Sequence, residues 1–374
     1  MNSRERVSAV LHYENVDRMP VVGFGYWEQT LDLWADQGHI SREMADAHHR
    51  LGPGSTADQA IMDVLGFDFN WNTCAGGYTK LLPAFETEVL EIEKDGAQII
   101  RNAEGLIVRV QNGVVSIPSE IGTSLTDRKA WEKLYLPRLQ YCDDRVNDAR
   151  FKQLAAENDT RTMPICLHLG SLYGDIRNML GIRELSYLAY DDEDLYIEII
   201  DTVAELCCRV AKRALTYGVK FDFAHFWEDI CFKNGPLVNP EVFRKLVGPH
   251  YRKITELVNA NGLDIVSLDS DGCIDKLLPI WLDNGVNTMF PIEVGTWNAS
   301  IAPWREQYGK TLRGVGGMDK RVFSRDRAAV DAEIERLKPL VDLGGYIPCP
   351  DHLLPIDSEF ELVQYYCEQF RKTF

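Results

Sequence analysis

The chain has 374 residues, of which 45% are hydrophobic, and its 57 acidic against 40 basic residues give a formal net charge of −17. A body this acidic repels phosphate backbones and anionic lipid, so the composition argues against a nucleic-acid or membrane-surface partner. No run of about 18 apolar residues is present, and the start of the chain lacks the apolar core of a signal peptide. We therefore expect a cytoplasmic protein.

Nine cysteines are spread irregularly along the chain, and no two of them form a Cys-x-x-Cys pair. A chain of this length does not need disulfides for its stability. The cysteines are therefore expected to be reduced thiols, and neither a zinc ribbon nor a thioredoxin-type site is expected.

Short elements are predicted in the first part of the chain. They are a helix over residues 1–12, a strand over 21–24, helical pieces over 28–66 and a further strand over 67–71. The helical pieces carry apolar residues at helical spacing, whereas the two strands are short apolar runs.

From residue 87 to 120 the side chains alternate between apolar and polar. Glycines at Gly96, Gly105 and Gly113 separate the alternating runs. This pattern is typical of a β-meander with glycine turns. We interpret the meander as an insertion in one domain that spans residues 1–374.

After residue 160, short apolar runs alternate with longer amphipathic segments. The runs are 163–169, 219–226, 263–268, 286–292, 312–315 and 345–349. The clearest helical patterns are 195–215, 240–259 and 328–341. Apolar strands separated by helices are typical of a parallel sheet covered on both faces. With the two early strands there are eight βα units, which predicts an α/β fold of the (β/α)8 TIM-barrel type; an open doubly wound sheet is the alternative.

In a barrel, functional side chains gather where strands end and loops begin. Asp269 and Asp271 end one predicted strand on the same face, and Cys349 ends the last strand. Carboxylates and a thiolate that converge from different strands suit Zn²⁺. Each residue also has an ordinary structural interpretation, because either aspartate suits a helix cap and Cys349 suits a buried core position.

Other polar and aromatic side chains follow the same strand ends. His168 and His225 lie on apolar strands, where single histidines are usually core residues, and Glu228 is either a site carboxylate or the structural partner of an arginine. The aromatic residues indicate a pocket for a flat substrate or ordinary packing. The candidate substrate-binding residues are Tyr26, Trp27, Trp71, Tyr173, Trp227 and Glu293.

Short motifs along nearly the whole chain form a recognisable set. They are Ser3-Arg4-Glu5-Arg6-Val7, Asp17-Arg18-Met19-Pro20-Val21, Gly170-Ser171-Leu172, Phe290-Pro291-Ile292-Glu293, Gly314–Lys320 and Gly344–His352. This set resembles the uroporphyrinogen decarboxylase superfamily, particularly its corrinoid-dependent methyltransferase branch, and the resemblance implies a (β/α)8 barrel. Porphyrin decarboxylases carry an arginine in an N-terminal motif, whereas residues 20–28 contain none. Decarboxylation is therefore the second alternative.

The thiol-loading methyltransferases of that branch hold zinc with a His-x-Cys motif and a distant Cys on the last strand. On this sequence the pattern falls on Asp269, Asp271 and Cys349, so carboxylates replace His and Cys. The resemblance therefore implies an oxygen-richer zinc site, with Cys273 and Glu228 as further candidate ligands. Zinc with oxygen ligands is a strong Lewis acid, which suits polarising the oxygen of a methyl ether.

The resemblance thus implies a zinc-dependent methyltransferase that cleaves a methyl ether, with a methoxylated aromatic as the expected donor. The methyl group is expected to pass to the Co(I) corrinoid (cobalamin) of a partner protein. His168, His225 or His352 is expected to protonate the leaving oxygen. The first alternative is a methylcorrinoid:thiol methyltransferase with a sulfur-dominated zinc shell. A binding protein on an inactive barrel is a further class, and it predicts no metal.

Overall fold

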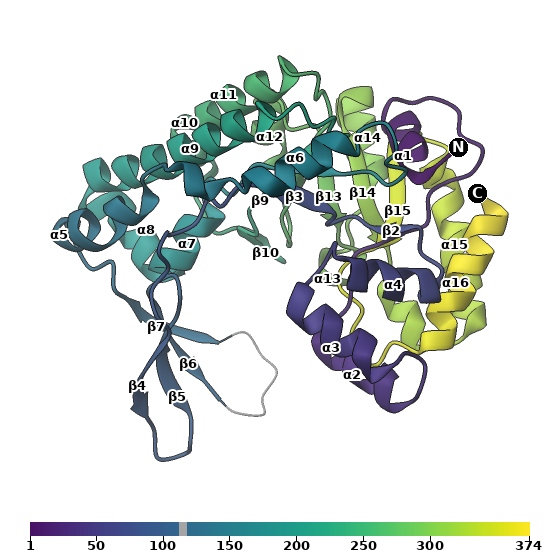
Figure 1. Ribbon diagram of the computed structural model, residues 1–374, viewed down its shortest axis with the longest axis horizontal. Helices are drawn as coiled ribbons and strands as arrows, with labels where there is room; N and C mark the ends of the chain where they lie inside the picture. The colour runs from purple at the N-terminus through teal and green to yellow at the C-terminus, as the bar shows by residue number, and fades with distance from the viewer. Residues whose placement is uncertain (112–117) are drawn as a thin grey trace.

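A parallel sheet of seven strands forms the centre of the chain, in the order β15-β14-β13-β12-β9-β8-β3 (Figure 1). The structure is a computed structural model that describes residues 1–111 and 118–374. The strands are β3 (Cys74–Gly76), β8 (Cys166–His168), β9 (Phe223–Trp227), β12 (Val266–Asp269), β13 (Thr288–Ile292), β14 (Arg313–Met318) and β15 (Tyr346–Pro350). Neighbours in the sheet are also successive along the chain, as the alternation of apolar runs and helices predicts.

A separate parallel pair consists of β1 (Val22–Gly23) and β2 (Phe69–Asn70). The segment after β1 is joined to the segment after β15, since Leu354 N–H donates to Gly25 O at 2.9 Å and Trp27 N–H donates to Leu354 O at 3.1 Å. Strand β3 was not predicted; it follows β2 directly and pairs with β8. The helix-covered parallel sheet confirms the α/β prediction and is consistent with a TIM-barrel-like fold.

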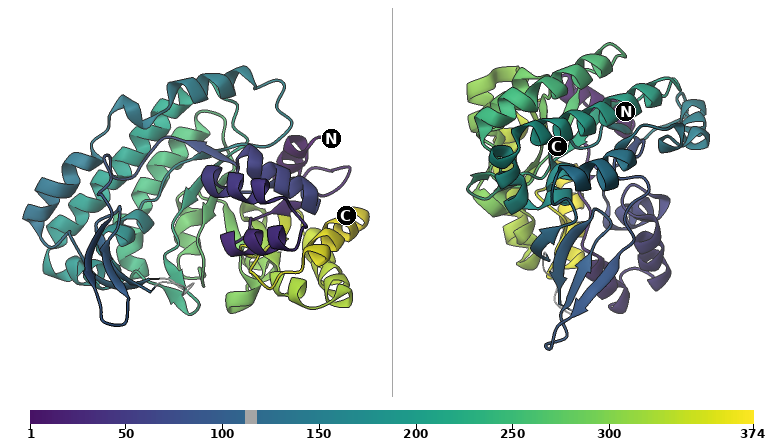
Figure 2. Two further views of the ribbon diagram at one scale, coloured as in Figure 1. Left: turned by 60° about the horizontal axis from the view of Figure 1, so that its bottom comes forward. Right: turned by 90° about the vertical axis from the view of Figure 1, so that its left-hand side faces the viewer.

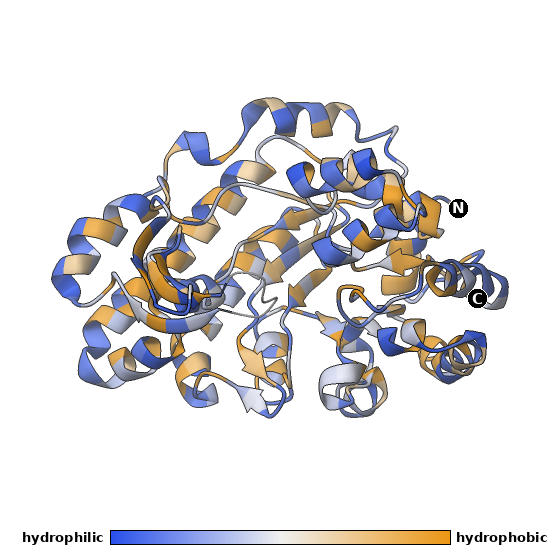
Figure 3. Cartoon of the chain, turned by 90° about the horizontal axis from the view of Figure 1, so that it is seen from below, coloured by the Kyte–Doolittle hydropathy of each residue, from blue (hydrophilic) through white to orange (hydrophobic). Residues whose placement is uncertain are grey.

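Helices cover the parallel sheet, and Figure 3 shows hydrophobic strands in the middle with helices that turn polar residues outward. The longer helices are α1 (Ser3–Leu11), α2 (Glu28–Asp36), α3 (Arg42–Leu51), α4 (Thr56–Leu65), α6 (Asp148–Ala156), α8 (Ile182–Asp191), α9 (Glu193–Leu215), α11 (Gly248–Asn259), α14 (Ile301–Tyr308), α15 (Arg327–Val341) and α16 (Phe360–Thr373). The shorter ones are α5 (Arg128–Ala130), α7 (Gly174–Leu180), α10 (Pro240–Leu246), α12 (Leu278–Asp283) and α13 (Val294–Trp297). Local sequence explains several starts: the Asn2 and Asp326 side chains accept hydrogen bonds from backbone N–H groups in the first turns of α1 and α15.

The predicted meander is a four-stranded antiparallel sheet that projects from the rest of the fold (Figures 1 and 2). Its strands are β4 (Glu88–Ile92), β5 (Gln98–Arg101), β6 (Leu106–Val110) and β7 (Ser119–Thr123). The turns at Gly96 and Gly105 have φ of 84°, a conformation that favours glycine. The turn expected at Gly113 lies outside the described residues.

Two cysteines depart from the expectation of reduced thiols. Cys74 and Cys166 are register partners on β3 and β8, with Cα atoms 4.6 Å apart, and a disulfide joins them. The prediction is therefore wrong for this pair, because it took no account of β3. The other cysteines are free thiols. No helix among the described residues combines the length and the apolar character that crossing a bilayer requires.

Candidate functional site

Four carboxylates meet where β9, β12 and β13 end. Asp269 closes β12, Asp271 lies two residues further on, Asp229 follows β9 and Glu293 follows β13. Burial raises the pKa of Asp269 well above its usual value, and the charges of Asp271, Asp229 and Glu293 raise it further. We call these four residues the carboxylate cluster. Their mutual repulsion favours proton uptake at this end of the sheet.

Asp269 lies between two aromatic residues. Its register partners are Trp227 on β9 and Phe290 on β13, and residues in register on neighbouring strands share one face of a sheet. The Phe290 ring packs against Phe24 at 4.5 Å and His225 at 6.2 Å between centroids. Asp269 is 7% exposed, and no hydrogen-bond donor from the described residues reaches its carboxylate.

Asp271 forms a pair with His352. The Asp271 Oδ2 atom lies 3.2 Å from His352 Nε2, while its buried Oδ1 has no partner among the described residues. The His352 ring stacks on Trp27 with centroids 6.1 Å apart and meets the Phe24 ring edge-on. Trp27 is 43% exposed, so the pair lies beside an accessible aromatic surface.

A half-buried lysine compensates part of the negative charge. Burial lowers the pKa of Lys320, while Asp351, Glu293 and Asp271 oppose that shift. Burial likewise raises the pKa of Asp351, whose carboxylate accepts hydrogen bonds from Gly295 N–H at 2.7 Å and Lys320 N–H at 3.3 Å. Lys320 therefore acts as an internal counter-charge for this part of the site.

Two further cations flank Trp227. The Lys80 ammonium lies 5.9 Å and the Arg177 guanidinium 6.0 Å from the indole centroid. Each has a carboxylate partner, since Arg177 lies 3.3 Å from Asp229 and Lys80 lies 3.9 Å from Asp175. Burial raises the pKa of Asp175 to about 6. The β8–β9 side of the site is thus a set of paired charges around one indole.

Glu228 has a structural role that excludes it from a ligand set. Its carboxylate, 0% exposed, accepts hydrogen bonds from a whole loop and from a tyrosine. The donors are the backbone N–H groups of Leu172, Tyr173 and Gly174 and the hydroxyls of Ser171 and Tyr251. Both oxygens are therefore occupied in holding the start of α7. The alternative of a structural partner is the better description, although the partners are N–H and O–H groups rather than an arginine.

His168 and His225 are held neutral inside the sheet. Burial lowers the pKa of His168 to about 4, with a smaller contribution from Lys80, and lowers that of His225 to about 3. His168 Nδ1 accepts a hydrogen bond from Gly170 N–H at 3.1 Å, and His225 Nδ1 has no partner among the described residues. Neutral imidazoles with such low pKa values lack the acidic proton of an imidazolium at neutral pH, so of the three candidate acids only His352 fits that role.

The sulfur ligands expected for zinc do not join the aspartates. The buried Cys349 thiol donates to Pro350 O at 3.5 Å, and Asp351 is the carboxylate that raises its pKa beyond the effect of burial. Cys273 is half-buried beside β10 (Cys231–Phe232), with its N–H bonded to Phe232 O at 2.8 Å. Within the described ranges, no group of three or more His, Cys, Asp and Glu side chains is placed to hold a metal ion.

Three predicted substrate-binding aromatics are core residues. Tyr26 donates to Asp58 at 2.6 Å, Trp71 stacks on Phe223 at 4.4 Å, and Tyr173 forms a 2.8 Å hydroxyl pair with Tyr196. All three are buried, so the ordinary packing interpretation holds for them. Trp27, Trp227 and Glu293 lie at the site, where Glu293 accepts from Gly272 N–H and Thr296 Oγ1.

The sequence analysis assigned no role to several residues of the site. Asp229, Lys320 and Asp351 follow predicted strands, and that position was the available signal. Phe290 lies within a predicted strand, but only the register shows that it flanks Asp269. Lys80 follows the unpredicted strand β3, and Arg177 lies on α7, so neither carried a signal.

Comparison with known proteins finds a shared fold but no matching sequence family. No family profile matches the chain, and no curated protein is similar enough in sequence to count as a relative. A solved methyltransferase from Methanosarcina mazei matches 100% of this chain and 98% of its own, with a TM-score of 0.61 and 15% identity. A B12-independent methionine synthase from Shewanella sp. W3-18-1 matches 95% of this chain and 98% of its own, with a TM-score of 0.48 and 12% identity. The first match shows that the chain shares the fold of that methyltransferase.

Proposed function

We propose that the chain is a single (β/α)8 barrel, closed through the β1–β2 pair, that removes a methyl group from a methyl ether and gives it to the corrinoid of a partner protein. The shared fold with a methyltransferase and the hydrogen bonds between the segments after β1 and β15 support the first part. A methoxylated aromatic remains the expected donor. The cytoplasm remains the compartment we propose, because a Co(I) acceptor needs reducing conditions, whereas the Cys74–Cys166 disulfide is more typical of an oxidising compartment.

The observation that carries this proposal is the His352–Asp271 pair beside Trp27. Asp271 holds one ring nitrogen of His352 at 3.2 Å, which leaves Nδ1 for a ligand. Trp27 stacks on the same imidazole, and 43% of the Trp27 residue is itself exposed to solvent. A proton donor next to an accessible indole suits a flat substrate whose oxygen must be protonated as it leaves.

The reaction balances with one proton from the protein. The bond between the methyl carbon and the ether oxygen breaks, and its electron pair stays on the oxygen. His352, protonated on both nitrogens, donates its Nδ1 proton to that oxygen, while Asp271 stabilises the charged ring through Nε2. The Co(I) corrinoid supplies the nucleophile that takes the methyl group. The free hydroxyl compound then leaves, and His352 regains a proton from solvent.

The residues do not fit the expected zinc site. Glu228 is fully engaged by donors from its loop, and Cys349 lies with Asp351 rather than with Asp269 and Asp271. The remaining candidates, Asp269, Asp271 and Cys273, form no metal-holding group among the described residues. We therefore derive no step through zinc, and the acid chemistry of His352 takes the place of metal polarisation in this proposal.

The two alternatives are less compatible with the site. Thiol loading requires a sulfur-dominated shell, whereas the side chains that meet here are carboxylates. Decarboxylation of a porphyrin requires cations for several substrate carboxylates, and the carboxylate cluster repels such a substrate. The thiol alternative remains an outcome of the experiment below.

The test is methyl transfer to a reduced corrinoid protein, followed by the cobalt absorption spectrum. Methoxylated aromatics should produce the methylated cobalt spectrum, whereas methanol and methylated thiols should not. His352→Gln should lower the rate by about 100-fold, as expected for loss of a general acid. A spectral change with methanol or a methylated thiol, and none with any ether, would refute the ether reaction.

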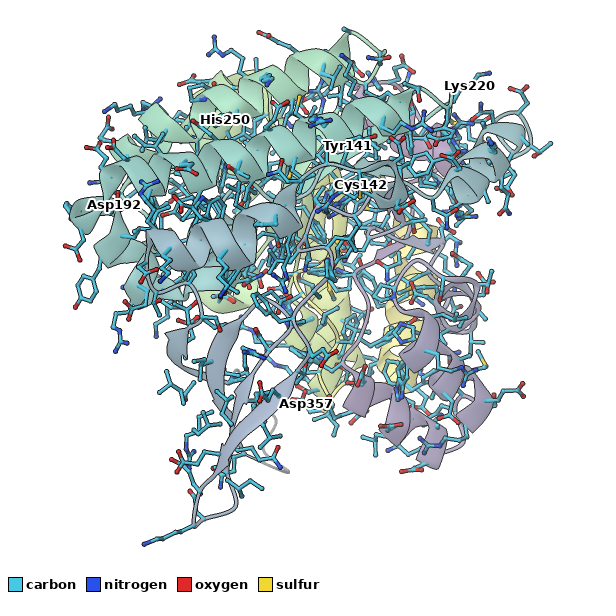
Figure 4. All side chains as sticks on the ribbon, turned by 60° about the vertical axis from the view of Figure 1, so that its left-hand side comes forward. Tyr141, Cys142, Asp192, Lys220, His250 and Asp357 are labelled. Atoms are coloured by element: carbon cyan, nitrogen blue, oxygen red, sulfur yellow. A yellow bond between two sulfur atoms is a disulfide. The ribbon has the colours of Figure 1, made fainter. Side chains whose placement is uncertain are left out.

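The chain offers a matched control for the His352 variant. His250 Nε2 lies 2.9 Å from Asp201 Oδ1 on the outer face of α9 and α11, where Figure 4 labels it. His250→Gln removes an imidazole from the same kind of Asp–His pair, far from the strand ends. Its rate should match that of the unmodified chain. Equal losses in both variants would show that His352 acts only through stability.

A further inference from the structure

Asp269 is a buried carboxylate that lacks a partner. It is 7% exposed, and the described residues offer no hydrogen-bond donor to either of its oxygens. A carboxylate without donors is unfavourable in a protein interior, because burial removes the water that stabilises its charge. Such a group at the carboxyl end of a strand in a parallel sheet is a candidate for ligand binding. A ligand that binds at Asp269 should therefore supply a positive charge or a strong hydrogen-bond donor.

The cations nearby already have carboxylate partners. The pairs are Lys80 with Asp175, Arg177 with Asp229, and His352 with Asp271. Lys320 is surrounded by Asp351, Glu293 and Asp271, and none of the groups that shift its pKa is Asp269. Conversely, the charges that act on Asp269 come from Asp271, Asp229 and Glu293, which are all acidic. Among the described residues, no cation therefore pairs with Asp269.

Aromatic rings adjoin Asp269 on both sides of its strand. Trp227 on β9 and Phe290 on β13 are its register partners, so the three side chains share one face of the sheet. Aromatic faces attract cations, and the attraction is strongest for Trp and in desolvated positions. A carboxylate between two aromatic side chains thus suits an alkylated ammonium group, whose carbon surface contacts the rings while its charge faces the carboxylate.

The geometry points to a binding position for an ammonium nitrogen, with Asp269 as its counter-ion and Trp227 and Phe290 as its aromatic walls. The inference rests on the proposed function in one respect, because we take the molecule bound at this position to be the methyl donor. The methyl donor is therefore expected to carry an ammonium group. An inorganic cation suits the position less well, since no third ligand joins Asp269 and Asp271 within the described part of the chain. The carboxylate cluster would attract such a donor, and repel an anionic one, before contact.

Calorimetric binding of two molecules of the same shape tests this inference. Choline and 3,3-dimethylbutan-1-ol differ by a charged nitrogen in place of a neutral carbon. Choline should bind the full chain at least about tenfold more tightly. Its binding should also release protons, because a cation favours the ionised form of Asp269. Comparing the binding heat in buffers with different ionisation enthalpies measures that release.

Asp269→Asn keeps the shape of the side chain and removes its charge. The variant should bind choline about tenfold more weakly, without proton release, and should bind the neutral alcohol as before. Asp201→Asn, on the outer face of α9, should bind both as the unmodified chain does. Equal affinity for the two molecules, undetectable choline binding, or unchanged choline affinity in Asp269→Asn would overturn the inference.

The binding experiment contains no methyl acceptor, so its outcome is independent of methyl transfer. Choline binding that depends on Asp269, together with no cobalt methylation by any ether, would refute the proposed reaction and keep the ammonium position. Cobalt methylation by a neutral ether, together with equal affinity for choline and the alcohol, would refute the ammonium position and keep the reaction.

Discussion

Glu228 and Asp269 are adjacent buried carboxylates with opposite surroundings. The N–H group of Glu228 donates to the carbonyl oxygen of Asp269 at 2.8 Å, so the two residues are neighbours in the sheet. Glu228 accepts hydrogen bonds from five donors, whereas Asp269 accepts none from the described residues. Both side chains are buried, with 0% and 7% exposure, and the clearest difference between them is the supply of hydrogen-bond donors.

This difference separates a role in folding from a role in binding. Burial raises the pKa of both residues, but hydrogen bonds from Tyr251 and the loop at 172–174 oppose the rise for Glu228. For Asp269, neighbouring carboxylates add to the rise. A carboxylate whose donors replace water stabilises the fold, while one without donors destabilises it and is available to a ligand.

The largest expected effect contrasts Glu228→Ala with Asp269→Asn. Glu228→Ala should lower the free energy of unfolding by at least about 5 kcal/mol, because five buried donors lose their acceptor and each loss costs about 1–3 kcal/mol. Asp269→Asn should raise stability at pH 7.5, since the folded chain disfavours ionised Asp269. Urea unfolding followed by circular dichroism measures both.

The sign for Asp269 follows from its raised pKa. The folded chain holds the proton of Asp269 over a pH range in which the unfolded chain has released it. This contribution to stability therefore falls as pH rises from about 4, the usual carboxyl value, through the folded pKa. If Glu228→Ala does not fold, the same unfolding measurement is made on Glu228→Gln, which keeps the shape of the Glu228 side chain. If Asp269→Asn were the less stable of the two, the comparison would fail.

Much of the fold was predictable because strand rhythm is a local property of the sequence. Every apolar run after residue 160 overlaps a strand of the parallel sheet, from β8 at Cys166–His168 to β15 at Tyr346–Pro350. Strand β3 escaped because Cys74–Gly76 is three residues long and is not an apolar run. The disulfide to Cys166 escaped with it, since only the pairing of β3 with β8 brings the two sulfurs together.

The site was predictable in its location but not in its partners. Position after a strand placed Asp269, Asp271 and His352 at one end of the sheet. Nothing in the sequence distinguishes Glu228 from Asp269, because the donors to Glu228 are mainly backbone N–H groups of another loop. Backbone donors leave no residue signature, so which carboxylate is satisfied is a property of the folded chain alone.

An intermediate effect extends the comparison to the buried histidines. The folded pKa values of about 4 for His168 and about 3 for His225 lie below the ordinary value of 6.5. The unfolded chain therefore binds more protons below pH 6.5, and stability is lost as pH falls through that value. Each ring should remove about 1.4 kcal/mol per pH unit once its unfolded form is protonated. Unfolding free energies at pH 7, 6 and 5 measure the slope.

A non-titrating variant isolates one ring. His225→Gln should lose less stability between pH 7 and pH 5 than the unmodified chain, because one of the two rings no longer takes up a proton on unfolding. Asp269 changes the free energy of unfolding in the opposite direction as pH falls. The His225→Gln variant and the unmodified chain are therefore compared over the same pH range, so that this contribution cancels. Identical slopes would show that His225 takes up no proton on unfolding, so that burial does not lower its pKa in the folded chain.

The smallest expected effect concerns Cys349, a buried group that resembles Glu228 in belonging to the fold. Its thiol donates to Pro350 O, and it belongs to the same hydrophobic core cluster as Ile347 and Tyr366. Cys349→Ala should therefore lower the free energy of unfolding by about 1 kcal/mol through lost packing. Zinc bound per chain, measured by elemental analysis, should be the same with and without the substitution. A stoichiometric loss of zinc in Cys349→Ala would instead place this thiol in a ligand set, and the carboxylates at 269 and 271 would have to be reassigned as its metal-binding partners.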